Sequence, residues 1–384
     1  MPSLSEISDA RVSTVRRRLL SWYDEYRRDL PWRKTKDPFA IWISESMLQQ
    51  TRVDTVIPYY ERFLDRFPTV DQLADAELED VYGLWTGLGY YSRARNLHSA
   101  AQTIVNEHAG QLPNTVKDLR KLKGIGPYTA GAVASIAFNK EEPLVDGNVI
   151  RVLTRWLDWR EDVSTKPVLD TLWKWAGRLV KGERPGDFNQ ALMELGATVC
   201  TPRAPRCLIC PIQRSCLGRQ AGDPESIPFK PKKKRAQSVQ GVAVWIERKG
   251  KGLAVRRPEG GLLGGMWELP GGTLETNENI EAGLRRCLHE SLSLKLGHLK
   301  AMGQIEHLFS HRRLKLHIFQ AHAFEGRIRR HEIAEHRWLS PERMAELPQG
   351  GPTRKALALL GKTSHESPRS RLKSERQNQK SLEP

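Results

Sequence analysis

The fold of this chain depends on residues 122–131, which read LKGIGPYTAG. Gly124 and Gly126 let the backbone turn sharply and approach a ligand closely. Pro127 fits the first turn of a following helix. The free N–H groups at the start of that helix would point at an anion such as a DNA phosphate. The stretch predicts two helices joined by a tight hairpin that contacts a DNA backbone through its glycines, with a purely structural hairpin as the alternative.

Helical spacing of apolar residues continues on both sides of the hairpin. The pair Asp37-Pro38 marks a helix start, with Asp as the N-cap and Pro at the first position. Asn114 or Thr115 can cap the helix that enters the hairpin. We expect an all-α domain over residues 1–220, with helices that include Val53–Phe67, Leu73–Trp85, Ala94–Ile104 and Val149–Trp159.

A second domain follows, because the apolar period changes from Val239 onward. Val239–Ile246, Leu253–Val255 and Leu314–Phe319 have strand character, and Ile280–Leu292 is a helix candidate. We expect an α/β or α+β domain over residues 239–350. Prolines and a basic block at residues 221–238 indicate a linker that is either solvated or in contact with phosphates. A nuclear localisation signal is the alternative. Residues 364–384 are basic and poor in apolar groups, which predicts a disordered tail.

The positive charge is concentrated in the C-terminal half. The chain has 384 residues and a net charge of +16. Residues 1–200 hold 27 basic and 27 acidic side chains, whereas residues 201–384 hold 34 and 18. This balance suits a polyanionic partner or simply favours solubility. No apolar run reaches membrane length and no signal peptide is evident. We expect a protein of the cytoplasm (the nucleoid in bacteria), or of the nucleus in a eukaryote.

Four of the five cysteines fall within 17 residues, in the pattern C-x6-C-x2-C-x5-C. Thiols of an intracellular protein stay reduced, so this density predicts a metal site. Zinc and an iron–sulfur cluster both take thiolates, and structural zinc usually has two C-x2-C pairs where this chain has one. The uneven gaps therefore favour an iron–sulfur cluster with a structural role. The expected ligands are Cys200, Cys207, Cys210 and Cys216.

Two carboxyl groups stand in positions suited to breaking a glycosidic bond. Glu45 lies on a helix among apolar residues, where desolvation raises a carboxyl pKa toward neutrality and permits general acid catalysis. Asp146 precedes a helix, and a capping carboxylate stays ionised through N–H bonds and the helix dipole. A neutral acid beside a fixed anion suits an oxocarbenium-like transition state. The alternatives are a solvated helical Glu and a purely structural cap.

Taken together, these motifs resemble the MutY-type adenine DNA glycosylases of the helix-hairpin-helix, or endonuclease III, superfamily. The resemblance covers about residues 8–345 and is densest before residue 220. It implies one 4Fe-4S cluster in the loop 200–216 and an all-α glycosylase domain followed by an α/β Nudix-like domain. The matching segments are Leu30–Arg33, Ser44–Thr51, Gly87–Tyr91, the hairpin, Val145–Val149 and the four cysteines.

The resemblance also implies individual roles. Glu45 would protonate adenine at N7, and Asp146 would stabilise the cationic sugar, if necessary through a transient covalent bond. Tyr128 and Asn148 would support these two. The walls of the adenine pocket would be formed by Trp32, Arg33, Leu48 and Gln190. Gln50 and Tyr90 would fill the gap that the flipped base leaves in the duplex. For Tyr90, ordinary core packing is the alternative. Endonuclease III-like relatives carry a Lys where this chain has Tyr128, and a Schiff base needs an amine, so we expect no efficient strand-cleaving lyase.

In the second domain, Gly272, Glu278 and Arg286 match the start of a Nudix box. The box then departs from its pattern: Cys287 and Ser291 replace two of its acids, so we expect the fold without the hydrolase activity. In the family this domain checks the base opposite the adenine, 8-oxoguanine. The resemblance gives this role to Phe309, Ser310 and His311, with Thr51 and Leu88 contacting the same base from the catalytic domain.

The sequence thus predicts a monomeric two-domain glycosylase that removes adenine opposite 8-oxoguanine or guanine in double-stranded DNA. An endonuclease III-like lyase is disfavoured by Tyr128, and a Nudix hydrolase by Cys287 and Ser291. A non-enzymatic DNA-binding cluster protein is disfavoured because Glu45 and Asp146 are both present within their motifs.

Overall fold

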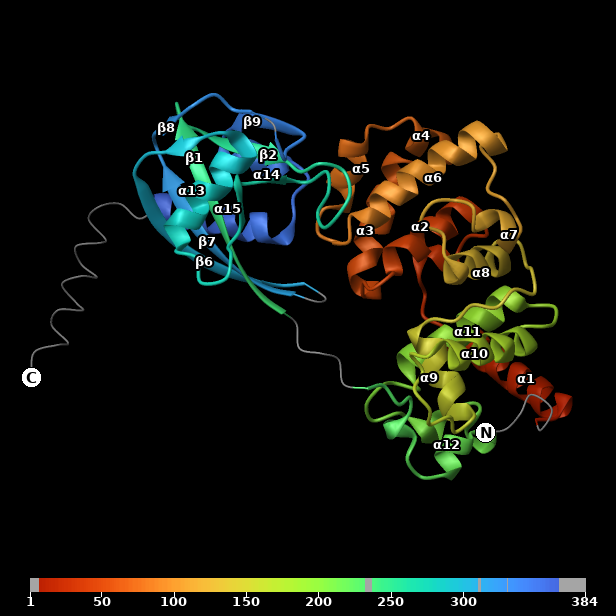
Figure 1. The fold of residues 1–384 in the computed structure, drawn as a ribbon. Coiled ribbons are helices and arrows are strands. Elements are labelled where there is room, and N and C mark those ends of the chain that lie inside the picture. The colour runs from red at the N-terminus through yellow and green to blue at the C-terminus, as the bar shows by residue number, and fades with distance from the viewer. Residues whose placement is uncertain (1–6, 232–236, 310–311, 330, 366–384) are drawn as a thin grey trace, which may run out of the picture. The chain divides into compact units, whose positions relative to one another are not determined.

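The computed structural model describes residues 7–231, 237–309, 312–329 and 331–365. It divides into two compact units, and each is described separately (Figure 1). The first unit contains Met1–Glu77 and Arg93–Lys233, and the second contains Leu78–Ser92 and Lys234–Pro384. Across the described ranges, no helix combines the length and the apolar character that crossing a membrane requires.

The first unit is helical, as predicted. Its main helices are α1 (Asp9–Tyr26), α2 (Pro38–Leu48), α3 (Val53–Arg66), α4 (Val70–Ala74), α6 (Ser92–His108), α7 (Val116–Leu119), α8 (Pro127–Ile136), α9 (Gly147–Trp156), α10 (Lys166–Leu179), α11 (Pro185–Thr198) and α12 (Leu217–Gln220). Short 3₁₀ turns add η1 (Pro31–Arg33), η2 (Cys207–Ile209), η3 (Gln213–Ser215) and η4 (Pro224–Ser226).

Helices α2 and α8 form the centre of this unit. Every residue from Phe39 to Met47 of α2 is buried, and so is every residue from Thr129 to Ile136 of α8. The two helices pack on each other, and α8 also packs on α11. Asp37 caps α2 as predicted, accepting the N–H groups of Phe39 and Ala40. A helix buried on all sides removes its polar side chains from water, which places the carboxyl of Glu45 inside the protein.

The predicted hairpin is confirmed between α7 and α8. The hydroxyl of Thr115 accepts the N–H of Asp118 at 3.1 Å and so caps α7. Gly124 has a φ of +82°, and a Cβ at this position would lie 2.6 Å from the Cβ of Asn96. Only glycine tolerates both the left-handed backbone and this close approach. Pro127 takes the first position of α8, which leaves the N-terminal amides of that helix at the turn.

The helix predicted over Leu73–Trp85 is wrong, because the chain forms two helices there. α4 ends at Ala74, and α5 (Leu78–Trp85) begins after a break. A ring nitrogen of His98 lies 2.8 Å from the carbonyl oxygen of Ala76, which is therefore engaged outside the helical ladder. The break arises from a contact with a residue far along the chain, and the local apolar spacing carries no signal of it. α5 groups with the second unit.

The second unit is built on a mixed sheet with the strand order β3-β2-β1-β7-β6, where β4 also pairs with β1 and β9 with β2. β1 and β7 are parallel, and the other pairs are antiparallel. The strands are β1 (Gln237–Arg248), β2 (Lys251–Arg256), β3 (Trp267–Glu268), β4 (Gly271–Thr273), β6 (Leu299–Leu308), β7 (Arg312–Ala321) and β9 (Glu335–Leu339), with β5 (Lys295–Leu296) and β8 (Phe324–Glu325) in a separate pair.

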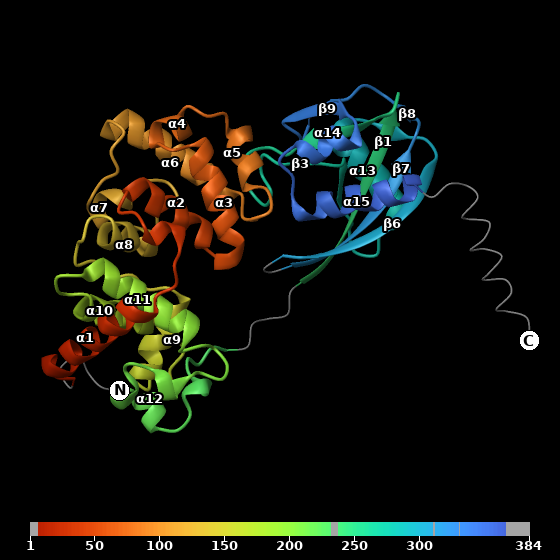
Figure 2. The same ribbon diagram turned by 180° about the vertical axis from the view of Figure 1, so that it is seen from behind.

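Helices cover both faces of this sheet (Figures 1 and 2). Alternate β1 residues Val242, Val244 and Ile246 pack with α13 (Ile280–Leu292), whose bounds match the prediction. Ala243 and Trp245 point to the other face and pack with α14 (Pro341–Glu346) and α15 (Gly351–His365). This two-residue alternation, with both faces covered, confirms the predicted α/β domain.

The residues expected as a linker and as a tail are described only in part. η4 lies inside the stretch 221–238, and Ile227 beside it is buried. β1 begins at Gln237, and residues 232–236 lie outside the described residues. α15 continues to His365, and residues 366–384 of the expected tail also lie outside them.

Candidate active site and cluster loop

Glu45 is a buried carboxyl group, 4% exposed, on the central helix α2. The hydroxyl of Tyr128, from the first turn of α8, donates to its Oε2 at 2.6 Å. Burial raises the pKa of Glu45 to about 7, although the Tyr128 hydrogen bond and the charge of Arg33 act in the lowering direction. The negative charge of Asp146 contributes to the raised pKa. Glu45 therefore exchanges a proton near neutral pH, as a general acid requires.

Asp146 caps α9 through its carboxyl group. Oδ1 accepts the N–H of Val149 at 2.7 Å, and Oδ2 accepts the side-chain amide of Asn148 at 3.0 Å. The cap was predicted, and so were the hydrogen bonds to its carboxylate. Burial raises the pKa of Asp146, and the hydrogen bonds from Val149 and Asn148 oppose this rise. The anion at this position is held by its hydrogen bonds against a desolvation cost.

Asn148 links Asp146 to an arginine. Its Oδ1 accepts from Arg151 at 2.7 Å, while its amide donates to Asp146. Arg151 also donates to the backbone carbonyls of Cys200 and Gly196, both at 2.7 Å. Gly196 allows α11 to approach here, because a Cβ would lie 2.6 Å from the Cβ of Asn148. The carboxyl of Asp146 is thus oriented by a chain of bonds that ends at the first residue of the cysteine loop.

The residues expected to wall a base pocket come from η1, α2 and α11. Trp32 is buried and meets the ring of Tyr60 edge-on, with 5.5 Å between the centroids. Arg33 follows it in η1, which packs on α2. Leu48 ends α2 and is half-buried. Gln190 is buried on α11, one turn before Met193, whose sulfur lies 3.3 Å from the Tyr128 hydroxyl.

The two residues expected to fill a gap in the duplex share an unusual backbone. Gln50 has a φ of 57° and is exposed, and Tyr90 has a φ of 51° and is 47% exposed. Left-handed φ values are strained for side chains of this size and concentrate at functional sites. Thr51 lies beside Gln50 and accepts a hydrogen bond from Arg93 at 3.3 Å. Leu88 is buried.

Leu88 and Tyr90 belong to Leu78–Ser92, which groups with the second unit. Within that unit, Tyr91 donates to the carbonyl of Gln349 at 2.8 Å. Phe309 is half-buried there, meets the ring of His307 with centroids 4.6 Å apart, and donates its N–H to the carbonyl of Arg312 at 2.8 Å. The other two residues of the expected recognition hairpin, Ser310 and His311, lie outside the described residues.

The cysteine loop places four free thiols around one small cavity. Cys200, Cys207, Cys210 and Cys216 all line it, together with apolar residues and arginines, and no acidic or histidine side chain does. Among the described residues, no group of three or more His, Cys, Asp or Glu side chains could hold a metal ion in this conformation. The donor chemistry nevertheless fits a sulfur-ligated cluster, because four cysteine sulfurs line the cavity and the remaining lining consists of apolar residues, two arginines and Gln213.

Arg155 braces this loop from α9. It is 2% exposed, and its guanidinium donates to the carbonyls of Thr201 at 2.7 Å, Pro202 at 3.0 Å and Ile227 at 2.8 Å. One buried cation thereby joins the start of the cysteine loop to the segment that leaves the first unit. Sequence reasoning missed Arg155, because its partners lie 46 to 72 residues away.

Two further residues near the site were also missed. Arg93 donates to the carbonyls of Ser46, Met47 and Gln49 and so closes the C-terminal end of α2 just beyond Glu45. Glu194 of α11 binds Arg28 and Arg33. Both are charged residues within helices, and the apolar spacing of those helices predicts the helix without drawing attention to the charged residue. Their only sequence signal is a charge on a helix that is otherwise buried.

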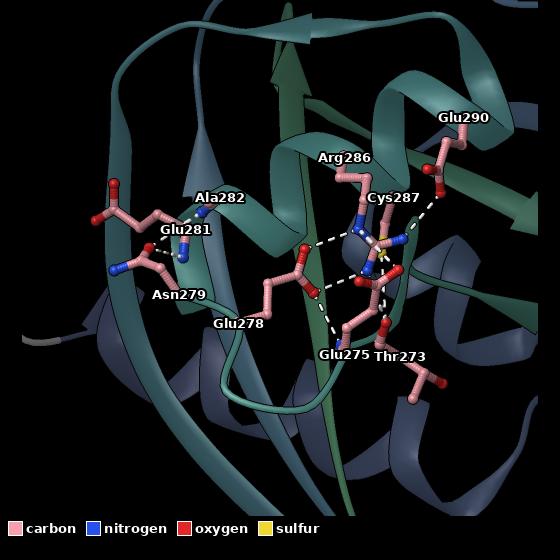
Figure 3. A network of polar contacts seen from close by, with 9 residues as sticks. All are labelled: Thr273, Glu275, Glu278, Asn279, Glu281, Ala282, Arg286, Cys287 and Glu290. Carbon is pink, nitrogen blue, oxygen red and sulfur yellow. Dashed lines mark hydrogen bonds and ion pairs between the residues drawn. The ribbon is translucent and has the colours of Figure 1, made fainter.

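In the second unit, the acids of the Nudix-like segment are paired with Arg286 (Figure 3). The guanidinium donates to Glu278 at 2.7 and 2.8 Å, to Glu290 at 2.9 Å and to the carbonyl of Thr273 at 3.3 Å. These hydrogen bonds from Arg286 lower the pKa of Glu278 to about 2. Figure 3 shows Arg286 between the two carboxylates, with Cys287 at the next position of α13.

Comparisons with known proteins match both units. The profile of the HhH-GPD superfamily of base excision DNA repair proteins matches residues 43–178, and that of the NUDIX domain matches residues 241–359. A solved structure described as a thermostable thymine-DNA glycosylase is 28% identical, with a TM-score of 0.51, over 56% of this chain and 98% of its own. That likeness supports the helix-hairpin-helix fold of the first unit.

Curated relatives extend over most of the chain. The adenine DNA glycosylase of Rattus norvegicus is 40% identical, with 84% of this chain and 72% of the relative covered. That of Homo sapiens is 39% identical, with 83% and 68% covered. That of Schizosaccharomyces pombe is 34% identical, with 83% and 84% covered. On these similarities and on its two-domain architecture, the chain belongs to the adenine DNA glycosylases, enzymes of base excision repair.

Proposed function

We propose that this enzyme hydrolyses the N-glycosidic bond of adenine mispaired with 8-oxoguanine, or with guanine, in duplex DNA. The observation that carries the proposal is the buried Glu45 carboxyl, with a pKa of about 7, bonded to Tyr128 and influenced by the charge of Asp146. An acid that holds its proton at neutral pH next to a capped carboxylate suits departure of a purine from deoxyribose. The identity of the enzyme's relatives supports adenine as the base.

The reaction begins when adenine leaves the duplex and enters the pocket walled by Trp32, Arg33, Leu48 and Gln190. The Glu45 carboxyl donates its proton to N7 of adenine. The C1′–N9 bond then breaks and its electron pair stays with the purine, which departs as a neutral base. Tyr128 keeps the Glu45 carboxyl oriented, because its own pKa is raised well above 10 by burial and it remains a hydrogen-bond donor.

The sugar left behind is an oxocarbenium ion, and the Asp146 carboxylate stabilises it. Asn148 and the N–H of Val149 hold that carboxylate in one orientation. Stabilisation proceeds either through space or through a transient ester bond between Asp146 and C1′. A water molecule then adds to C1′ and gives its proton to Glu45, which restores the acid and leaves an abasic site. No amine stands at position 128, so we propose no efficient lyase step.

The partner is duplex DNA, and the enzyme acts on it as a monomer wherever the cell keeps its DNA. Gln50 and Tyr90, already held in left-handed conformations, fill the space that the flipped base vacates. Thr51 and Leu88 contact the opposite base, and the hairpin of Phe309, Ser310 and His311 selects 8-oxoguanine. Gly124 and Gly126 present the amides of α8 to a phosphate. A 4Fe-4S cluster on the four cysteines would fix the shape of a basic loop.

One assay tests this proposal. Duplexes carrying adenine opposite 8-oxoguanine, guanine or thymine, or carrying thymine glycol, are incubated with the enzyme and then treated with alkali or with buffer. We expect strand breaks only for adenine opposite 8-oxoguanine or guanine, and only after alkali. Cutting at thymine glycol, or breaks without alkali accompanied by a borohydride-trapped adduct in high yield, would overturn the proposal in favour of a lyase.

A further inference from the structure

Glu194 is a buried carboxylate that the proposed mechanism does not use. It lies on α11 with an exposed fraction of 0%. Its Oε1 accepts from Arg28 Nε at 2.7 Å, and its Oε2 accepts from Arg28 at 2.8 Å and from Arg33 at 2.8 Å. Although burial alone would raise the pKa of Glu194, the hydrogen bonds from Arg28 and Arg33 lower it to about 2. Glu194 is therefore an anion at every pH at which the enzyme works.

One of the two arginines that bind Glu194 is Arg33 of η1, whose charge acts on Glu45. Arg33 is the residue after Trp32, and its side chain is 10% exposed. Its guanidinium is fixed on three sides: by Glu194, by the carbonyl of Arg28 at 3.0 Å, and by the ring of Tyr23 with 5.3 Å to the centroid. On the same helix as Glu194, the sulfur of Met193 meets the hydroxyl of Tyr128. α11 thus contacts both the arginine and the phenol that influence Glu45.

We propose that Glu194 is a positioning residue that keeps the general acid protonated by holding and neutralising Arg33. This inference rests on the proposed function. A bare guanidinium facing Glu45 would favour the ionised carboxylate and remove the proton that adenine must receive. The Glu194 carboxylate, which Arg33 shares with Arg28, offsets part of the field of Arg33 and leaves the remaining N–H groups of Arg33 available to a ligand.

The direction of the effect follows from the groups that face Glu45. Tyr128 from α8 bonds to Glu45, and the charges of Asp146 at the start of α9 and of Arg33 from η1 act on it. α3 also packs on α2, and its buried Tyr60 has a pKa raised to about 12 by burial, so it stays neutral. Glu45 must be protonated for base release, so activity is full below its pKa and falls as pH rises through it. Loss of the Glu194 charge lowers the pKa of Glu45 and moves that fall to lower pH.

The test is the pH profile of adenine release under single-turnover conditions with enzyme in excess over an adenine·8-oxoguanine duplex. For Glu194→Gln we expect the alkaline limb to move to lower pH by about one unit, the size expected for one added net charge nearby at an effective dielectric constant of about 20. Glu194→Asp keeps the charge and should leave the limb in its parent position even if the rate falls. A limb that does not move in Glu194→Gln contradicts the proposal.

Arg28→Met gives an independent answer if Glu194→Gln fails to fold, which its circular dichroism would reveal. This variant removes a cation and leaves the Glu194–Arg33 pair balanced, so the limb should move to higher pH. If Glu194, Arg28 and Arg33 had a purely structural role, both variants would be slower at all pH values and the alkaline limb would not move. That outcome overturns the proposal. Failure of the proposed function itself is distinguished by Glu45→Gln, which would then release adenine at the parent rate.

Discussion

Each unit of this enzyme contains carboxylates and arginines that act on one another, and the two arrangements have opposite consequences. In the helical unit, Arg33 is bound to Glu194, and Glu45 is left with a phenol and a raised pKa of about 7. In the Nudix-like unit, Arg286 binds Glu278 directly, and the pKa of that carboxyl falls to about 2.

Burial alone does not keep a carboxyl protonated, because Glu194 is as buried as Glu45 and yet the bonds from Arg28 and Arg33 lower its pKa to about 2, whereas Glu278 is only half-buried. Glu45 is buried and bonded to a neutral phenol, and the cation that acts on it, Arg33, is bound to Glu194. Conversely, an acid bound by its own arginine is a permanent anion and can hold a loop onto a helix, as Glu278 does at the start of α13. The pattern of pairing therefore differs between the carboxyl proposed as the general acid and the acids of the Nudix-like unit.

The strongest test of this contrast makes the same change, glutamate to glutamine, in each of the two units. Glu45→Gln should reduce single-turnover release of adenine by about 10²- to 10⁴-fold, because it removes the general acid. Glu278→Gln should leave that rate unchanged, because its carboxylate accepts from Arg286 and from the N–H of Glu275, both within the Nudix-like unit. Both rates are measured with enzyme in excess over an adenine·8-oxoguanine duplex. Equal losses in the two variants, or parent-like release by Glu45→Gln, would remove the basis of the comparison.

A second test asks whether the helical unit depends on its cysteine loop. Cys210→Ser should remove a ligand of the proposed cluster and destabilise the unit by on the order of 4 kcal/mol, as loss of a structural metal site typically does. Iron content and visible absorption should fall with the melting temperature. Cys287→Ser is the matched control, since this buried thiol belongs to the other unit and is surrounded by apolar side chains. Purified protein that contains zinc and no iron would contradict the cluster assignment.

How far the sequence predicts this molecule depends on the range of the contacts involved. Asp37, Thr115 and Pro127 were placed correctly, because helix caps are formed by residues within one turn. The bounds of α13 were predicted because its apolar face repeats over the whole helix. The Leu73–Trp85 helix was predicted wrongly, because the break depends on His98, more than twenty residues away.

The candidate site follows the same rule. Glu45 and Asp146 stand out because each lies in a recognisable local setting, an apolar helix and a helix start. Arg93, Arg155 and Glu194 could not be found in that way, since each acts on groups that are more than forty residues distant. The raised pKa of Asp146 was likewise not foreseen, because the degree of burial depends on how α9 packs against the rest of the unit.

A smaller effect is expected at Tyr128, whose phenol hydroxyl is bonded to the Glu45 carboxyl. The Tyr128 hydrogen bond acts to lower the pKa of Glu45. Tyr128→Phe removes that bond and leaves only the charge of Arg33 to oppose burial, so the pKa of Glu45 should rise above its present value of about 7. In the proposed mechanism the protonated acid is the active form, so the alkaline limb of the single-turnover profile should move to higher pH by about one unit, as a hydrogen bond to a charged group implies. A shift to lower pH would mean that the phenol favours the protonated carboxyl.

The smallest expected effect concerns the pairing in the Nudix-like unit. Arg286 is bonded to two carboxylates and one carbonyl, but its side chain is 29% exposed, so solvent screens these interactions. Arg286→Met should therefore lower the free energy of unfolding of that unit by only about 1 kcal/mol. Urea denaturation followed by circular dichroism measures this change, and the adenine-release rate should stay at the parent level. If the rate fell together with the stability, the acids released from Arg286 would be influencing catalysis, and the separation of roles between the two units would not hold.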